Sequence, residues 1–392
     1  MSGAAAETEP DNRRWGIVAA IAAVAVFGIS VGQAGPLMSL ILEARGVDAT
    51  TNGLVAGSAF LGVLVGPLLA PPGIRHLGLR NYLALCFLMQ ILLFPLLRLT
   101  DSLLVWSVLR MVMATFGAGI FTASEAWITM LAGKRSRGRV LGLYAATLSA
   151  GFGAGPLLLT LTGIEGWTPF VVNGAVSALA FIPLALAGGS AQSLGRERGG
   201  NPLVIFRHAP MLLFTVALFG LYEQAMMALL PVWGLRLGLS RDAAAVALTA
   251  IFAGAIVLQW PIGILSDRAS RAAAFRLCGG LGIAGAVLLA VLPLEGAARL
   301  AVLFVWGGAV SAIYPVALSM AGDRFRGAEM VAANAAMIVA YGLGSLVGPP
   351  MGGIAMDMLG PAGLPQLFVL LFALLLGASL LPEAGRGTPA GP

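Results

Sequence analysis

The sequence predicts an all-α membrane protein in which twelve transmembrane helices form two pseudo-symmetric bundles of six. Of its 392 residues, 59% are hydrophobic and only 10% are charged, and the mean hydropathy is +0.93. Soluble globular chains carry about 25% charged residues. The apolar runs reach the roughly 20 residues that a membrane-spanning helix needs, and they lack the strict alternation of barrel strands. The third observation is that landmarks of the first half recur in the second.

The twelve predicted helices follow one another with short connections. The first six cover residues 15–42, 52–73, 81–98, 102–131, 139–163 and 167–188. The second six cover residues 211–236, 243–265, 273–294, 298–320, 329–355 and 363–381. The first run opens with Arg13, Arg14 and Trp15 and has no small-residue cleavage site, so we expect a retained helix rather than a signal peptide. The resulting organisation is a tail (1–14), a bundle (15–188), a linker (189–210), a second bundle (211–382) and a tail (383–392).

The positive charge follows the predicted topology. If the first helix runs outward, 17 of the 23 Lys and Arg residues fall on the side of the termini and five on the opposite side. This bias predicts that both termini are cytoplasmic. We also expect the membrane to be the inner membrane of a bacterium. The net charge of +6 is therefore explained by topology, and we expect no nucleic-acid partner.

The two halves repeat each other. The pair Gly155-Pro156 recurs as Gly348-Pro349, 193 positions later, and Pro36 recurs as Pro231, 195 positions later. These offsets are close to half the chain length, which indicates a duplicated six-helix unit. Two such repeats are typical of transporters that bind solute at the repeat interface.

Six stretches, in their order along the chain, resemble motifs of one transporter family. They are "LRMVMATFGAG" (109–119), "SRGRVLGLY" (136–144), "LQWPIG" (258–263), "GILSDRASR" (263–271), "IYPVALS" (313–319) and "YGLGSLVGPP" (341–350). Together they resemble the major facilitator superfamily over essentially the whole chain, and within it the YcaD-type branch. Asp267 and Arg268 match the acid and base of its loop signature, which implies a gating role. The corresponding first-half loop has Arg75 where the acid is expected.

Glycine and proline recur at helical spacing in two predicted helices. The residues are Gly151, Gly155 and Pro156 in one helix and Gly344, Gly348 and Pro349 in the other. Small residues four apart let membrane helices approach closely, and proline bends a helix at a defined place. Since the resemblance places these helices between the halves, we expect surfaces on which the halves move. Ordinary tight packing without motion is the alternative.

Three charged residues lie within predicted membrane helices, namely Arg110, Glu125 and Glu223. Each costs roughly 2.5–3.5 kcal/mol at a helix centre and must face protein or water. We expect Glu125, Glu223 or both to couple proton movement to transport. The alternative is that each carboxylate is permanently paired and structural.

The resemblance implies a central cavity lined by the first, fourth, seventh and tenth helices. These helices supply Gln33, Arg110, Trp127, Tyr222, Gln224, Met226, Trp306 and Tyr314. Aromatic side chains with a few polar groups suit a flat organic solute. Tyr144, Asn334 and Tyr341 are lesser candidates. Soft ligands for copper do not converge, since Met226 and Met227 are adjacent and point about 100° apart.

These observations predict a secondary active transporter that works by alternating access. Its solute is expected to be small, organic, and aromatic or amphipathic, with protons as the coupling ion. A riboflavin-like vitamin importer of the same superfamily is an alternative, and a non-transporting receptor or scaffold is an alternative from another class. No nucleotide loop or catalytic constellation is evident, so we expect neither an enzyme nor a metal or cofactor site. We expect a monomer, because one chain contains both halves.

Overall fold

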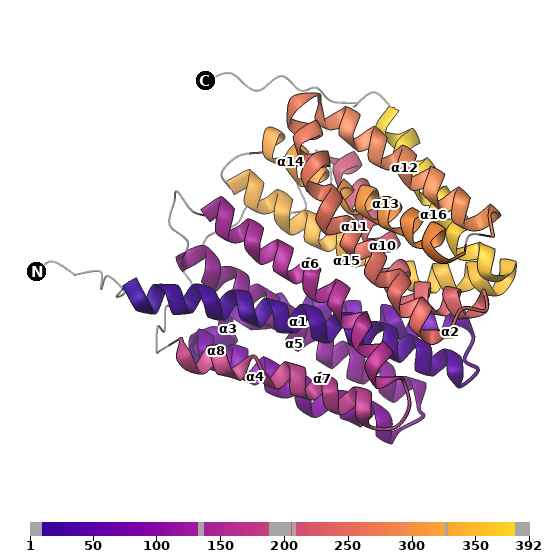
Figure 1. The fold of residues 1–392 in the computed structure, drawn as a ribbon. Coiled ribbons are helices and arrows are strands. Elements are labelled where there is room, and N and C mark those ends of the chain that lie inside the picture. The colour runs from indigo at the N-terminus through magenta and orange to yellow at the C-terminus, as the bar shows by residue number, and fades with distance from the viewer. Residues whose placement is uncertain are drawn as a thin grey trace, which may run out of the picture. The chain divides into compact units, whose positions relative to one another are not determined.

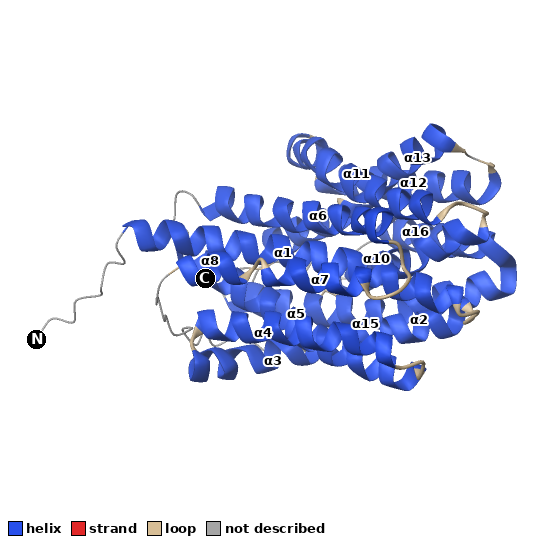
Figure 2. Ribbon diagram, turned by 60° about the horizontal axis from the view of Figure 1, so that its bottom comes forward, coloured by secondary structure: helices blue, strands red, loops and turns tan. Residues whose placement is uncertain are grey.

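The computed structural model describes residues 10–131, 137–187, 205, 209–293, 295–325 and 328–380. Within these ranges the chain forms helices and loops but no strand, as Figure 2 shows. Eleven stretches of described helix are long and apolar enough to cross a bilayer, and the last, Ala332–Leu380, contains two helices. The predicted all-helical membrane architecture is therefore confirmed. The two predicted tails lie largely, and the linker almost wholly, outside the described residues.

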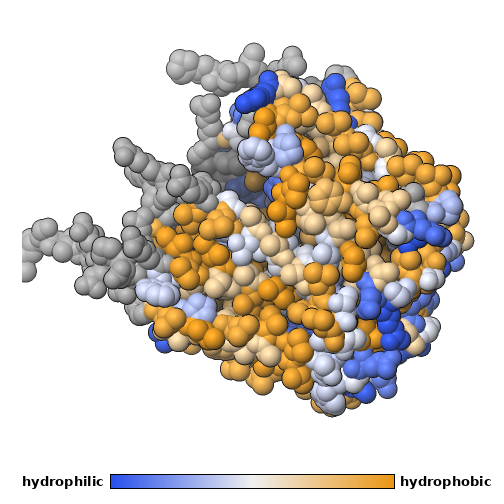
Figure 3. All heavy atoms as spheres, viewed as in Figure 1, coloured by the Kyte–Doolittle hydropathy of each residue, from blue (hydrophilic) through white to orange (hydrophobic). Residues whose placement is uncertain are grey.

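Large apolar side chains cover much of the described surface. Leu68 is 74% exposed, Leu161 82% and Val291 71%. Hydrophobic residues also dominate the face drawn in Figure 3. Such exposure is unfavourable in water and expected in lipid, where a bilayer covers the apolar surface.

Two compact units emerge from the described contacts, and the first comprises Met1–Gly46, Ser58–Arg196 and Ser240–Thr249. Here α1 packs along α6 and α5, while α3 packs on α5 (Figure 1). Its helices are α1 (Pro10–Ala44), α3 (Ala59–Leu77), α4 (Leu79–Leu93), the 3₁₀ helix η1 (Phe94–Leu99), α5 (Leu103–Leu131), α6 (Arg137–Thr162), α7 (Thr168–Ala178) and α8 (Phe181–Leu186).

The second unit comprises Val47–Gly57, Glu197–Leu239 and Ala250–Pro392. In it α10 and α2 pack on α15, and α12 packs on α13 and α16. Its helices are α2 (Ala49–Gly57), α10 (Pro210–Arg236), α12 (Arg271–Val291), α13 (Gly296–Ser311), α14 (Ile313–Arg324), α15 (Ala328–Leu359), the 3₁₀ helix η2 (Gly360–Ala362) and α16 (Gly363–Leu380). Helix α11 (Arg241–Arg268) begins in the first unit and continues in the second.

The two units are not simply the first and second halves of the chain, because two short segments group with the unit of the other half. Residues 47–57 group with the second unit, and residues 240–249 group with the first. In the first unit, the Thr249 hydroxyl donates to the Gly153 carbonyl of α6 at 2.9 Å. Tertiary hydrogen bonds of this kind cannot be read from hydropathy, so the sequence predicted unbroken bundles.

Side-chain caps and helix breaks set the ends of several helices. The carboxylate of Asp48 accepts the Thr51 N–H at 2.8 Å, and the Ser270 hydroxyl accepts the Ala273 N–H at 3.0 Å. Both satisfy backbone donors that have no partner within a helix. Three predicted helices are interrupted in the structure, one at Ser58, one at Leu179 and Ala180, and one at Ala312.

The glycine stripes pack inside the units. A Cβ at Gly151 would lie 2.9 Å from Gly28 Cα on α1, and a Cβ at Gly155 would overlap the backbone of Gly32. Helix α1 therefore packs on this face of α6 within the first unit, a contact that the tight-packing alternative describes, and movement of the halves on this face stays a prediction. The i, i+4 spacing specifies a close approach but does not specify which helix is the neighbour.

Candidate functional site

Glu223 lies on α10 where that helix closely approaches α15. The approach depends on Gly344 and Gly348, because a Cβ at either position would overlap the carbonyl of Ala217 or Leu221. Thus the second glycine stripe joins α15 to α10, its partner in the same unit. This close approach brings a polar side chain of α15 beside Glu223.

Tyr341 is the polar residue that α15 supplies. It lies one turn before Gly344, and its hydroxyl donates a hydrogen bond to Glu223 Oε2. Gln224 Nε2 donates to the same hydroxyl at 3.3 Å. A carboxyl, a phenol and an amide from two helices therefore share one hydrogen-bonded cluster.

Two further aromatic rings, those of Phe219 and Tyr314, adjoin this cluster. The centroid of Phe219 lies 5.6 Å from that of Tyr314 and 6.4 Å from that of Tyr341, and the two tyrosines are 6.2 Å apart. These separations are typical of tilted and edge-to-face aromatic contacts. Tyr314, Tyr341, Glu223 and Gln224 are all half-buried, so the cluster keeps part of its surface open.

The Glu223 carboxyl has no cationic partner among the described side chains. Its hydrogen bond from Tyr341 is the polar interaction that the structure gives it. An unpaired charge is unfavourable inside a membrane protein, and a carboxylate can lose its charge by taking up a proton. The arrangement can therefore hold and release one proton next to an aromatic surface.

Several predicted cavity residues are instead fully packed. Tyr222 is 1% exposed, and its ring lies 5.4 Å from Trp306 and 5.1 Å from Phe368. Trp306 donates its ring N–H to the Gly282 carbonyl at 2.9 Å. Met226 and Trp127 are each 2% exposed. These four predicted residues belong to hydrophobic cores in the structure.

Gln33 is also wholly buried, at 0% exposure. Its Nε2 donates to the Pro169 carbonyl at 3.2 Å, and its Oε1 accepts from Asn173 Nδ2 at 3.1 Å. Gln33 therefore ties α1 to α7. The position of Gln33 in the sequence does not show that its side-chain amide bonds to residues of the same unit.

The two charged residues of α5 lie far apart. Glu125 is exposed and makes no hydrogen bond or ion pair with a described residue. Arg110 is only 9% exposed, and its guanidinium donates to Met38 Sδ at 3.4 Å, while Nε has no partner in the described part of the chain. Fifteen residues of helix separate them by about 22 Å, which excludes a direct pair.

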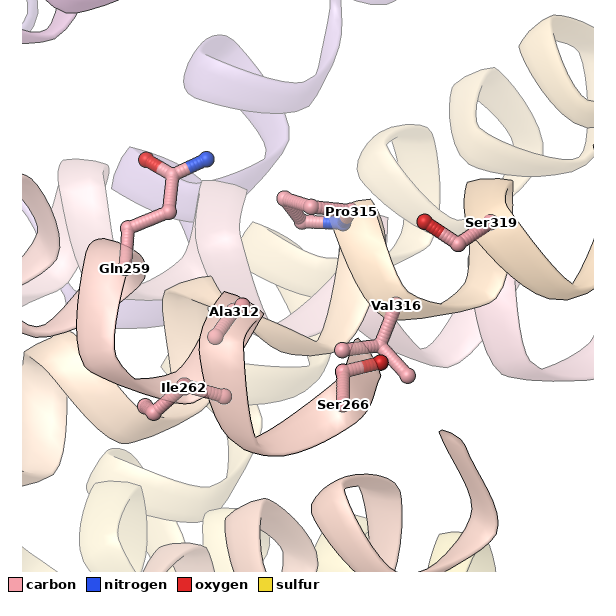
Figure 4. Close-up of a pocket in the computed structure, with 8 residues that line it drawn as sticks. Gln259, Ile262, Ser266, Ala312, Pro315, Val316 and Ser319 are labelled. Carbon is pink, nitrogen blue, oxygen red and sulfur yellow. The ribbon is translucent and has the colours of Figure 1, made fainter. Parts of the chain in front are cut away.

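A cavity of about 130 Å³ lies between α11 and α14. Figure 4 shows that α11 contributes Gln259, Ile262 and Ser266, while Pro315, Val316 and Ser319 come from α14. Ala312, at the break before α14, and Gly263 complete its lining. Three of the stretches that carry the family resemblance supply this lining, but none of its polar side chains was predicted as a site residue.

The predicted gating loop is described in part. Arg268 is exposed at the end of α11, whereas the Asp267 side chain lies outside the described residues. Arg271 pairs with Asp323 and donates to the Ser319 carbonyl, which links the start of α12 to α14. This ion pair was not predicted, because its two members are 52 positions apart.

Comparisons with known proteins agree with this architecture. The family model described as Major Facilitator Superfamily matches residues 18–308 and residues 212–390. The MFS-type transporter YfkF of Bacillus subtilis (strain 168) is 29% identical over 375 residues, covering 94% of this chain and 95% of that protein. An MFS-type transporter of Yersinia pseudotuberculosis serotype O:3 (strain YPIII) is 28% identical over 338 residues, covering 85% of this chain and 86% of that protein.

Solved structures share the fold at low sequence identity. A bacterial homologue of the human lysosomal transporter Spinster has a TM-score of 0.75 and 15% identity, covering 95% of this chain and 96% of that chain. The nucleoside transporter NupG has a TM-score of 0.75 and 12% identity, covering 94% of this chain and 97% of that chain. At these identities the comparison establishes the fold.

Proposed function

Because the chain belongs to the major facilitator superfamily of membrane transporters, we propose that it is a proton-coupled secondary transporter of a small aromatic or amphipathic organic solute. The carrying observation is the cluster of Glu223, Tyr341 and Gln224 beside two further rings. Its carboxyl group takes up and releases the coupling proton. The adjoining aromatic faces stack on the solute, and the amide and phenol orient it.

Glu223 is the preferred coupling residue for a physical reason. A proton-coupling group must change its charge during the cycle, so a permanent cationic partner would oppose that change. Glu223 has a neutral hydrogen-bond partner instead. Glu125 remains a second candidate, since it is exposed and lacks a hydrogen bond to described residues.

The aromatic surface also supports the narrower alternative, which is a riboflavin-like vitamin. The described rings of Phe219, Tyr314 and Tyr341 can contact a flat heterocycle, but they do not select one heterocycle over another. A solute panel must therefore include aromatic vitamins and cationic dyes. A non-transporting receptor is the remaining alternative, and it predicts binding without movement.

The test is transport by the purified protein in vesicles across an imposed pH gradient. We expect wild type to accumulate a panel member, a protonophore to abolish the accumulation, and Glu223→Gln to lose gradient-driven accumulation while it retains solute exchange. Glu125→Gln is measured in parallel, and Glu165→Gln, at an exposed ion pair, is the matched control. Full gradient-driven accumulation by Glu223→Gln would remove this residue from the mechanism.

We further propose a monomer in the bacterial inner membrane with both termini in the cytoplasm. The Lys and Arg bias along the sequence supports this orientation. Reporter fusions at the C-terminus test it, because a fluorescent protein that folds in the cytoplasm should be active there. Activity of a periplasmic phosphatase fused at the same point would reverse the orientation.

A further inference from the structure

Two sequence motifs that the proton-coupling cluster does not explain meet in the cavity between α11 and α14. The first motif, "LQWPIG" (258–263), contributes Gln259 and Ile262. The second, "IYPVALS" (313–319), contributes Pro315 and Ser319. The cavity is therefore built from both motifs, together with Ser266, although 53 positions separate Ile262 from Pro315 in the chain.

The helical spacing explains why a cavity forms there. Gln259 and Ser266 are seven residues apart on α11, which places them two turns apart on one face. Ala312 and Ser319 have the same spacing along α14 and its preceding residue. Small or polar residues on both facing surfaces leave space that larger apolar side chains would fill.

The break between α13 and α14 adds a backbone feature to this site. Helix α13 ends at Ser311, and α14 begins at Ile313. Pro315 has no N–H, so it cannot donate the usual hydrogen bond to the Ser311 carbonyl. Ala312 keeps right-handed helical dihedral angles (φ −75°, ψ −13°) between α13 and α14, and both Ala312 and Pro315 line the cavity.

The lining indicates an uncharged ligand with hydrogen-bonding groups. Its polar side chains are Gln259, Ser266 and Ser319, and none of the eight lining residues is ionisable. Ser266 is only 7% exposed, and its hydroxyl makes no hydrogen bond with a described residue. Because this hydroxyl lines the cavity, a ligand there can exchange a hydrogen bond with it.

The volume limits the size of that occupant. The cavity measures about 130 Å³. In a protein core, an engineered apolar cavity of about 150 Å³ accommodates one benzene ring. Ile262, Pro315 and Val316 supply the apolar walls that a ring contacts.

We propose that this cavity binds an uncharged six-membered ring that carries a carboxamide or hydroxyl group. The ring is the recognition group of the transported solute, an assignment that rests on the proposed transport function. Gln259 pairs with the amide or hydroxyl, and the Ser266 hydroxyl completes the hydrogen bonding. Charged ring compounds bind more weakly because none of the eight lining residues carries a counter-charge.

The test measures binding of three ring probes to the purified full-length protein by saturation-transfer NMR with competition. Benzamide and phenol are expected to bind, and benzoate is expected to bind at least about tenfold more weakly. Ser266→Ala should weaken benzamide binding about three- to tenfold, as for the loss of one neutral hydrogen bond. Ser379→Ala is the matched control, because that hydroxyl bonds only locally, to the Leu376 carbonyl of α16.

Two variants fill the cavity from different positions. Ala312→Leu places bulk at the helix break, and Ser319→Leu does so from an exposed position that tolerates a larger side chain. We expect each to reduce benzamide binding by more than about tenfold. Any of three results would overturn the proposal and leave a cavity that holds only water. They are unchanged benzamide binding by a folded filling variant, equal binding of benzoate and benzamide, and no binding of any probe.

Glu223→Gln separates this proposal from the proposed function. Its gradient-driven transport is the readout of the proposed function, whereas benzamide binding by the cavity variants is the readout of the ring site. If the cavity variants lose probe binding and Glu223→Gln keeps full gradient-driven transport, the ring site is retained and Glu223 is rejected as the proton-coupling residue. The reverse pattern would reject the ring site alone.

Discussion

The carboxylate of Asp357 on α15 holds Thr50 at the start of α2 by two hydrogen bonds, one from the backbone N–H at 2.8 Å and one from the hydroxyl at 2.7 Å. The same carboxylate accepts the Ala49 N–H and pairs with Arg236 of α10, each at 3.1 Å. A negative charge at a helix N-terminus is favourable because unpaired N–H groups and the helix dipole point toward it. Asp357 therefore joins three helices of the second unit.

We expect Asp357→Asn to lower the free energy of unfolding by about 1–2 kcal/mol, since charge-assisted hydrogen bonds are stronger than neutral ones. The measurement is thermal unfolding in detergent with a thiol-reactive dye, because Cys86 and Cys278 are both buried and become reactive on unfolding. Glu165→Gln removes an ion pair whose carboxylate side chain is 82% exposed, and it should leave the melting temperature unchanged. Equal effects of the two substitutions would contradict the role given to Asp357.

A second prediction concerns the close approach of α15 to α10. Gly344→Ala should destabilise the protein by about 1–3 kcal/mol or more, because its methyl group would overlap the Ala217 carbonyl and force the helices apart. The same dye assay measures the effect, and loss of expression counts as destabilisation only if the control expresses normally.

Gly280→Ala is the control for that substitution. No atom lies within 4 Å of a Cβ built there, so alanine should be neutral or stabilising by up to about 1 kcal/mol in a helix interior. A Gly344→Ala protein as stable as Gly280→Ala would show that the helices separate without cost.

The third prediction concerns the buried hydrogen bonds between α1 and α7. Asn173 donates to the Ser30 carbonyl at 3.0 Å and to Gln33 Oε1 at 3.1 Å, and it accepts from the Ser30 hydroxyl at 3.0 Å. Asn173→Ala should cost about 2 kcal/mol, given about 0.6 kcal/mol for each interhelical hydrogen bond in a membrane and some loss of packing. Thr160→Val, which removes only a local bond to the Leu157 carbonyl, should have little effect on the melting temperature.

The fourth prediction separates stability from function at Arg110. Arg110 is 9% exposed, and Met38 is the hydrogen-bond partner of its guanidinium among the described residues. Replacing an unpaired buried charge with an apolar side chain of similar length should leave stability unchanged or raise it. Arg110→Met should therefore melt at or above the wild-type temperature and still reduce solute transport. A lower melting temperature with unchanged transport would identify Arg110 as purely structural.

The amino-acid sequence by itself determined that this protein lies in lipid, and it determined the fold class and the family. Long apolar runs with few charges indicate helices in lipid, because a bilayer leaves the backbone no other partners. The recurrence of Gly155-Pro156 as Gly348-Pro349 marked the duplication. The sequence also placed Glu223 in a membrane helix, where a carboxyl group is costly and thus informative.

Tertiary structure alone decided which of the candidate residues meet. Tyr341 reaches Glu223, 118 positions away, because glycines let α15 approach α10. The side-chain amide of Gln33 instead forms hydrogen bonds with Pro169 and with Asn173 of α7. Both Tyr341 and Gln33 are polar groups in apolar helices, and the sequence does not distinguish them. The physical reason is that helical periodicity specifies which face a residue occupies, whereas the neighbour of that face depends on how all the helices pack.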